Sequence, residues 1–407
     1  MRRTVVLMAS MALTVLLASG VALALNTIRC DGGKCNGTPR NDRMLGTTKR
    51  DIMYGFKGED RLLGEGSNDD LYGFDGRDVL IGDAGSDKLG GGEDNDELHG
   101  FGGADSASGG VDNDNLDGGD GNDELSGGDG RDNFWNTDHG NDTIHGGLGS
   151  DTFGLSDVGD DKVFGGPGEY RDFFNYDTQW RASGQDLLDG GNGNDSYFFD
   201  DSFRFGRPAR WGHVTIADSD VAPAPDGNVP VEDEVQFYFW RRDLTITLVP
   251  GPGPEATDGI STAQWSDPGE FREVLGGDGD DTITGDKWPN VISGEWGANT
   301  LSGGGGNDVL DSDDDGGTLD GGGGDDNIAG HRGATLLGGG GNDHMTVEGE
   351  DPEQPPALPS NLHGGPGHDD IRARNGSPDT IDCGDGTDTV IYDATDTVTN
   401  CEDASTG

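Results

Sequence analysis

The chain has 407 residues, of which 77 are glycine and 79 are aspartate or glutamate, and its formal net charge is −53. Hydrophobic residues make up only 30%, which is typical of disordered chains because little apolar surface is available to offset chain entropy. The negative charge also argues against nucleic acid as a partner. A folded state therefore requires a regular pattern that composition alone does not reveal.

Residues 1–24 have the pattern of a secretory signal peptide. Arg2 and Arg3 precede an apolar run, and Ala22-Leu23-Ala24 fits the rule of small residues around the cleavage site. We therefore expect a secreted, extracellular protein, released or held at the cell surface, with no stable membrane insertion after signal cleavage. A single membrane-anchoring helix is the alternative, because the apolar run approaches spanning length.

Four cysteines allow three disulfide connectivities. The local pairs Cys30 with Cys35 and Cys383 with Cys401 are favoured, because each pair brackets one end of the repeats described below and solenoid ends need a cap. Residues 25–36 then form an N-terminal disulfide cap. Metal-binding cysteines are a weaker alternative, since no CxxC or His/Cys spacing accompanies them. Disulfides and a signal peptide both indicate an oxidising compartment.

A nine-residue repeat dominates the first tract, residues 37–195. Each repeat has a glycine, an aspartate five positions later and an apolar residue two positions after that. Calcium prefers six to eight oxygen ligands, and two stacked turns can supply them if one coil holds two repeats. Eleven repeats then give roughly nine interior sites, while the apolar column points inward. The aspartates of the unbroken run are Asp42, Asp51, Asp60, Asp69, Asp78, Asp87, Asp96, Asp105, Asp114, Asp123 and Asp132.

This pattern, best developed in Gly118-Gly119-Asp120-Gly121-Asn122-Asp123-Glu124-Leu125, resembles the haemolysin-type calcium-binding repeats of the RTX family. The resemblance implies an all-β fold, a parallel β-roll or β-solenoid with several Ca²⁺ ions between successive turns. An acidic low-complexity linker is the alternative. The first turns are degenerate, with Arg40 and Lys49 where a glycine usually stands, and are expected to serve as a cap. After residue 154 the register loosens, with candidates at Asp161, Asp172, Asp186 and Asp195.

Residues 196–274 interrupt the repeats with an aromatic, β-prone insert. Alternation in Val235-Gln-Phe237-Tyr-Phe239-Trp240 suggests half-buried strands. One interpretation is a set of bulkier coils that covers the end of the first roll. The other is an aromatic face that binds a cell-surface or extracellular polysaccharide, or acts on one. The first is favoured, because buried aromatic residues are more common than displayed ones.

A second, partly degenerate tract covers residues 275–398, followed by the C-terminal disulfide cap to residue 407. Asn290 and Asn299 stand in the aspartate column, and Gly317 and Ala334 occupy it without any carboxylate. The apolar column continues, so we expect the coil to persist where the metal does not. Residues 349–361, rich in proline, are expected to form an exposed loop.

The predicted metal ligands are the aspartates of the well-formed turns in both tracts. They are Asp60, Asp69, Asp78, Asp87, Asp96, Asp105, Asp114, Asp123, Asp132, Asp142, Asp151, Asp186, Asp195, Asp281, Asp308, Asp326, Asp343, Asp369, Asp379 and Asp388.

No catalytic motif is recognisable. HExxH and GxSxG are both missing, and the glycine-rich runs are explained by the nonapeptide. We therefore predict no enzymatic activity. Two functions remain open: a secreted calcium-binding protein with a structural or surface-interaction role, which folds on binding extracellular calcium, and a polysaccharide-binding or polysaccharide-active protein that uses the insert.

Overall fold

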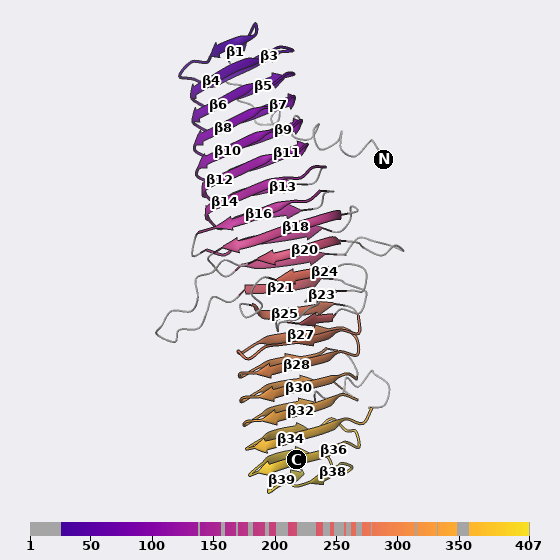
Figure 1. Cartoon of the computed structure of the whole chain (residues 1–407). Coiled ribbons are helices and arrows are strands. Elements are labelled where there is room, and N and C mark those ends of the chain that lie inside the picture. The colour runs from indigo at the N-terminus through magenta and orange to yellow at the C-terminus, as the bar shows by residue number, and fades with distance from the viewer. Residues whose placement is uncertain are drawn as a thin grey trace.

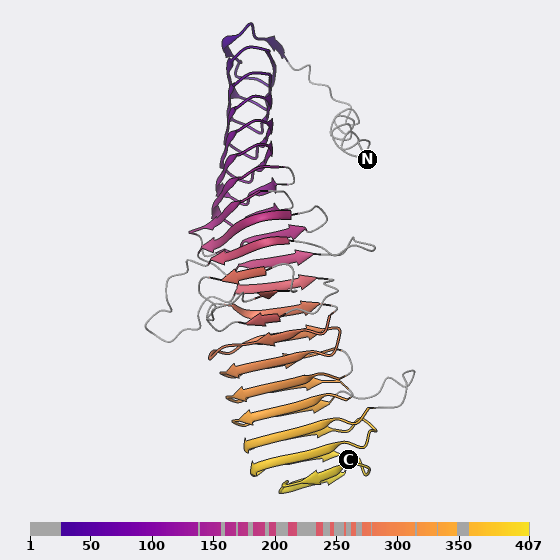
Figure 2. The ribbon, with the colours of Figure 1, turned by 45° about the vertical axis from the view of Figure 1, so that its right-hand side comes forward.

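The protein is an elongated stack of short β-strands, seen in a computed structural model and shown in two views in Figures 1 and 2. The structure describes residues 26–136, 139–155, 159–167, 170–177, 182–191, 195–200, 211–217, 233–238, 245–247, 256–257, 262–265, 271–277, 279–313, 316–331, 333–347 and 358–406. In this part of the chain every regular element is a strand and none is a helix. The predicted all-β fold is confirmed.

The described strands form two sheets, and the chain alternates between them. Sheet A contains β1 (Asn26–Arg29), β3 (Asp42–Thr47), β5 (Arg61–Glu65), β7 (Val79–Ala84), β9 (Glu97–Gly102), β11 (Asn115–Asp120), β13 (Asn133–Asn136), β15 (Thr152–Leu155), β17 (Phe173–Asp177), β19 (Ser196–Asp200), β21 (Asp233–Tyr238), β25 (Phe271–Gly277), β27 (Val291–Glu295), β29 (Val309–Asp311), β31 (Asn327–Gly330), β33 (His344–Val347), β35 (Asp370–Ala373), β37 (Thr389–Tyr392) and β39 (Asp403–Thr406).

Sheet B contains β2 (Gly33–Asn36), β4 (Asp51–Lys57), β6 (Asp70–Asp75), β8 (Lys88–Glu93), β10 (Ser106–Val111), β12 (Glu124–Gly130), β14 (Thr143–Gly149), β16 (Lys162–Gly166), β18 (Ala182–Gly191), β20 (Trp211–Ala217), β22 (Thr245–Thr247), β23 (Ala256–Thr257), β24 (Thr262–Trp265), β26 (Thr282–Thr284), β28 (Thr300–Gly305), β30 (Thr318–Gly323), β32 (Thr335–Gly340), β34 (Asn361–Gly367), β36 (Thr380–Gly386) and β38 (Thr397–Thr399). One coil is therefore one strand of each sheet, which is two nonapeptides.

Strand pairing is parallel and repeats with the predicted two-nonapeptide period. Leu71 of β6 pairs with Leu89 of β8, eighteen residues later. Between β12 and β14 the step grows by one residue, Leu125 pairing with Ile144, where the sequence slips near Trp135. Only β23 pairs antiparallel among the described strands, with β22 and β24. Strands of the insert continue both sheets, since β19 pairs with β21 and β21 with β25 in sheet A, and β18 pairs with β20 and β20 with β24 in sheet B.

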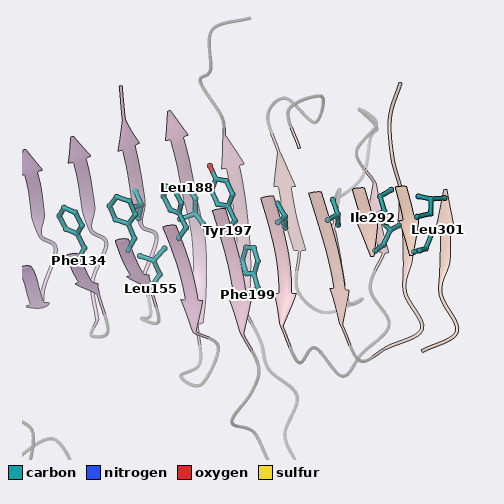
Figure 3. Packing of buried hydrophobic residues seen from close by; sticks show 14 of the residues in the cluster. Phe134, Leu155, Leu188, Tyr197, Phe199, Ile292 and Leu301 are labelled. Atoms are coloured by element: carbon teal, nitrogen blue, oxygen red, sulfur yellow. The ribbon is translucent and has the colours of Figure 1, made fainter. Parts of the chain in front are cut away.

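The core is a narrow column of apolar side chains between the two sheets. Each coil adds one inward residue from each sheet, such as Leu80 and Leu89, which are 0% and 1% exposed. Figure 3 shows this column passing from Phe134 through Tyr197 to Leu301. Where the first tract meets the insert, leucine gives way to stacked rings, with 4.8 Å between the Phe153 and Phe174 centroids. The predicted inward apolar column is confirmed.

Both disulfides join the local pairs that the sequence favours. Cys30 is bonded to Cys35 and Cys383 to Cys401, at the two ends of the described coils. The second bridge spans 18 residues and the first only 5. A cross-link removes more entropy from the unfolded chain when its loop is longer. We therefore expect the C-terminal bridge to stabilise the folded state more than the N-terminal one.

Replacing Cys383 and Cys401 together by serine is expected to lower the free energy of unfolding in calcium by about 3 kcal/mol, as chain entropy predicts for a loop of this size. The Cys30→Ser, Cys35→Ser variant is the matched control, and its shorter loop should cost less. Urea unfolding of the three proteins measures the difference. Equal losses for both variants would contradict the entropic account.

Candidate metal sites at the two edges of the solenoid

The turns between strands lie along two edges of the stack. Edge I contains the turns that lead from sheet B to sheet A, and edge II contains the turns that lead from sheet A to sheet B. The aspartates of edge I are Asp42, Asp60, Asp78, Asp96, Asp114, Asp132, Asp151, Asp172, Asp195, Asp308, Asp326, Asp343, Asp369 and Asp388. Those of edge II are Asp51, Asp69, Asp87, Asp105, Asp123, Asp142, Asp161, Asp186, Asp281 and Asp379. All of them are buried, with at most 5% of each residue exposed.

In most of these aspartates, one carboxylate oxygen accepts a hydrogen bond from the backbone of the neighbouring coil. The backbone N–H of Asp51 donates to Oδ1 of Asp69, and the N–H of Asp69 donates to Oδ1 of Asp87, both at 2.7 Å. The same bond joins Asp78 to Asp96 on edge I, also at 2.7 Å. These ladders fix each carboxylate between two turns and leave its second oxygen for another partner.

The second oxygen, Oδ2, is buried and accepts no hydrogen bond at many of these positions. A carboxylate oxygen removed from water without a partner is costly, so a repeated orphan indicates a missing ligand. The orphaned Oδ2 atoms belong to Asp60, Asp69, Asp78, Asp87, Asp96, Asp105, Asp114, Asp123, Asp132, Asp151, Asp326, Asp343, Asp369, Asp379 and Asp388.

The first glycine of each turn makes room for that oxygen. A Cβ added at Gly64 would lie 2.5 Å from Oδ2 of Asp69 and 2.8 Å from the carbonyl oxygen of Gly82 in the next coil. At Gly338 the corresponding distances to Oδ2 of Asp343 and to the Gly364 carbonyl are both 2.5 Å. Only glycine therefore fits, and a carboxylate oxygen and a backbone carbonyl oxygen flank the same small space.

Burial makes these carboxyl groups hard to ionise in the absence of a cation. Desolvation raises the pKa of Asp69 to about 7 and that of Asp96 to about 8, and neighbouring aspartates of the same column add to the shift. The hydrogen bond from the adjacent backbone N–H acts in the opposite direction but is weaker. The pKa is also raised to about 7 at Asp78, Asp114, Asp123 and Asp151, and to about 6 at Asp60, Asp105, Asp132, Asp343, Asp369 and Asp379.

These features fit a hard cation held by oxygen atoms. No three His, Cys, Asp or Glu side chains among the described residues converge into a metal site by themselves. Each turn supplies a single carboxylate to its column, so backbone carbonyls of the glycine turns would have to complete the coordination. A mixed set of carboxylate and carbonyl oxygens suits Ca²⁺. The positive charge of the bound ions would also neutralise the stacked carboxylates of the column. The aspartates and the glycine carbonyls beside them are therefore the residues that would hold it.

The predicted ligands all fall on these two edges, while their coordination of calcium stays a prediction. Asp161 and Asp172 are turn candidates in the sequence, where the register loosens, but they are not among the predicted metal ligands. In the structure both sit in the columns, and the N–H of Asp151 donates to Oδ1 of Asp172 at 2.7 Å. Desolvation raises the pKa of Asp172 to about 8. Burial and column position mark these two as further candidates.

The first turns differ from the rest, as their degenerate sequence suggested. Oδ2 of Asp51 accepts hydrogen bonds from the backbone N–H and the hydroxyl of Thr47, at 2.8 and 3.0 Å. Thr38 makes the equivalent bonds to Asp42. In these turns threonine donates hydrogen bonds to the aspartate Oδ2, the atom that has no partner in later coils. These turns therefore need no cation to hold their carboxylates.

Two aromatic residues at the start of the insert are buried in the core. Tyr197 and Phe199 are both 0% exposed, and the Tyr197 hydroxyl accepts a hydrogen bond from the N–H of Gly190 at 2.9 Å. Phe203 and Phe205 lie outside the described residues. Within the described part of the chain, no helix is long and apolar enough to cross a membrane.

Comparison with known families supports the calcium assignment. The family model of the RTX calcium-binding nonapeptide repeat (4 copies) matches residues 36–71, 64–98, 72–107, 99–134, 136–153, 182–201, 275–310 and 318–337. The matches fall in both tracts and cover the turns with orphaned oxygens from Asp60 to Asp151 and at Asp326. No curated protein matches the chain.

Proposed function

Because the chain belongs to the RTX calcium-binding nonapeptide-repeat family, we propose that it is a secreted protein that folds when it binds extracellular calcium. Its role is then structural or one of surface interaction, without catalysis. The observation that carries this proposal is the column of buried Oδ2 atoms without hydrogen-bond partners, most of them beside the first glycine of the turn.

In this proposal, calcium binding supplies the stabilisation that the fold needs. Without it, buried carboxylates of like charge stack coil upon coil, and a chain with 30% hydrophobic residues has little apolar burial to oppose them. Each site at one hundred times its Kd adds about 2.7 kcal/mol to the stability of the folded state. Extracellular calcium modules have Kd values of about 10⁻⁴–10⁻³ M, so the chain would stay unfolded in the cytosol.

Two features support an extracytoplasmic location. The N-terminal sequence has the charge and apolar pattern of a signal peptide. The two disulfides at the ends of the solenoid require an oxidising environment to form and persist. A polysaccharide partner has less support, because the buried Tyr197 and Phe199 are unavailable as a displayed stacking surface.

Adding calcium to the purified, chelator-treated protein is expected to convert a coil spectrum into a β spectrum in far-UV circular dichroism. Magnesium at equal concentration is the control, and it should have little effect, because it demands octahedral geometry at about 2.0–2.1 Å and gives up its water reluctantly. A β spectrum that is already complete in chelator would contradict the proposal.

A further inference from the structure

The two edges of the solenoid differ in how long they keep the calcium-binding turn. Edge I has glycine at the first turn position and aspartate five or more residues later throughout the first tract, from Gly37 to Asp195. It has them again in the second tract at Asp308, Asp326, Asp343 and Asp369, whereas Asn290 replaces the first aspartate of this column and Cys383 replaces the glycine before Asp388. On edge II, the glycine and the aspartate are both present in every turn only as far as Asp123.

On edge II of the second tract, side chains fill the space that the glycine leaves open elsewhere. Ser312, Val347 and Ala373 stand two residues after an inward apolar residue, the position of Gly64 in the first tract. All three are buried, at 1%, 3% and 0% exposed. Since a Cβ at this position collides with the carboxylate oxygen and the next carbonyl, these turns have lost the cradle.

Asn299 shows the replacement in detail. Its Oδ1 accepts the N–H of Asp281 at 2.8 Å, so the aspartate ladder is preserved. Its Nδ2 takes the place of Oδ2, beside Gly294, and donates to the Ser312 hydroxyl at 3.1 Å. A hydrogen-bond donor therefore points where a cation would need an acceptor, and the buried serine satisfies it.

The next turns of edge II carry no carboxylate in the column until Asp379. Gly317, Ala334 and Ser360 occupy the position. The N–H of Thr335 donates to the Gly317 carbonyl at 3.0 Å, and the N–H of Gly333 donates to the Ser360 hydroxyl at 3.1 Å. Neutral hydrogen bonds and packing hold this edge together.

Edge I of the same coils keeps the arrangement of the first tract. The N–H of Asp308 donates to Oδ1 of Asp326 at 2.8 Å, and the N–H of Asp343 donates to Oδ1 of Asp369 at 2.9 Å. Oδ2 of Asp326, Asp343 and Asp369 is buried without a partner. In these coils edge I thus retains a buried carboxylate oxygen beside a glycine, while edge II carries no carboxylate in its column between Asp281 and Asp379.

We propose that the coils of residues 300–369 in the second tract bind calcium along edge I only, whereas the coils of residues 60–132 in the first tract bind it along both edges. These coils of the second tract therefore take up about half as many ions per coil and fold with a shallower calcium dependence. Because their edge II stacks no like charges, they need less calcium to reach the folded state. This inference rests on the proposed function, since it concerns how the same sites are distributed along the molecule.

Hydrogen exchange of the full chain, read by mass spectrometry over a series of free calcium concentrations, tests the inference. Peptides from residues 300–347 should become protected at lower calcium than peptides from residues 60–132. The slope of protection free energy against the logarithm of calcium counts the ions bound on folding, and it should be about twofold smaller per coil in the second tract. Protection of both tracts with one midpoint and equal slopes per coil would overturn the inference and leave the proposed function intact. Protection that is indifferent to calcium everywhere would overturn the proposed function itself.

Two substitutions locate the effect on the edges. Asp326→Asn, on edge I, should lower the calcium slope of the second tract, whereas Asp320→Asn removes the same charge from the outer face of β30 and should leave it unchanged. Asn299→Ala, on edge II, should reduce protection without changing that slope, because no ion is lost. A lower slope in Asn299→Ala would show that edge II of the second tract does bind calcium.

Discussion

Gly64→Ala is expected to be among the most damaging single substitutions in the first tract. The new methyl group would lie 2.5 Å from Oδ2 of Asp69 and 2.8 Å from the Gly82 carbonyl, so both candidate calcium ligands must move. Overpacking of this kind costs about 1–3 kcal/mol. Loss of a site that is occupied at one hundred times its Kd would cost about 2.7 kcal/mol more. Urea unfolding in saturating calcium measures the sum.

Gly66→Ala is the matched control for this substitution. It makes the same chemical change two residues away, but the nearest atom to the added Cβ is the Ala84 carbonyl oxygen at 3.8 Å. Its free energy of unfolding should stay within about 1 kcal/mol of the parent protein, which is the usual range of glycine-to-alanine effects. If both variants lost equal stability, the space beside Asp69 would have no special role.

Acid should have opposite effects on the calcium-free and the calcium-loaded protein. In the calcium-free fold the pKa is about 7 for Asp69 and about 8 for Asp96, compared with about 4 for an exposed aspartate. The folded state therefore holds protons that the unfolded chain has released. This contribution to stability is fully present below about pH 4 and is lost as pH rises through about 6–8. In chelator, the β spectrum should therefore grow when pH falls from 8 to 5.

In calcium the direction reverses, because protons and calcium compete for the same carboxylates. The calcium affinity of the folded protein should fall as pH falls through the same range, by about tenfold per pH unit if one proton is displaced per ion. Circular dichroism in chelator at pH 5, 6, 7 and 8 checks the first effect, and calcium-binding isotherms at the pH values where the β spectrum is present without calcium check the second. A calcium affinity of the folded protein that does not depend on pH would mean that the buried carboxylates are not the calcium ligands.

The repeat made most of the fold predictable. Gly64, Asp69 and Leu71 recur with a fixed period, which predicts the inward column. The resemblance to the RTX repeats implies the β-roll, and with two repeats in each coil the carboxylates stack. The apolar residue must face inward in every coil, so the register could not slip without exposing the whole column. The disulfide pairing followed from the position of each cysteine pair at an end of the array.

The remaining features depend on relations between coils that the sequence does not state. Asp161 and Asp172 were turn candidates but were left out of the predicted ligands, because the nine-residue spacing breaks around them. The pairing of β15 with β17 and of β16 with β18 places both in the columns. The sequence did not reveal that side chains occupy the glycine position on edge II of the second tract. Ser312, Val347 and Ala373 stand out only when the turns are assigned to their edges. Phe56 and Phe74 take a position that glycine fills in other coils, each at a φ of 84°, and stack on one another with centroids 5.8 Å apart.

The most direct test of the account is an anomalous-scattering map from crystals of the protein grown in calcium. We expect cation peaks along both edges of residues 60–132, each at about 2.3–2.6 Å from an aspartate Oδ2 and from backbone carbonyl oxygens. In the second tract the peaks should follow edge I alone, beside Asp326, Asp343 and Asp369. A folded solenoid whose first-tract columns show no cation peaks would contradict the central claim that calcium holds these carboxylates together.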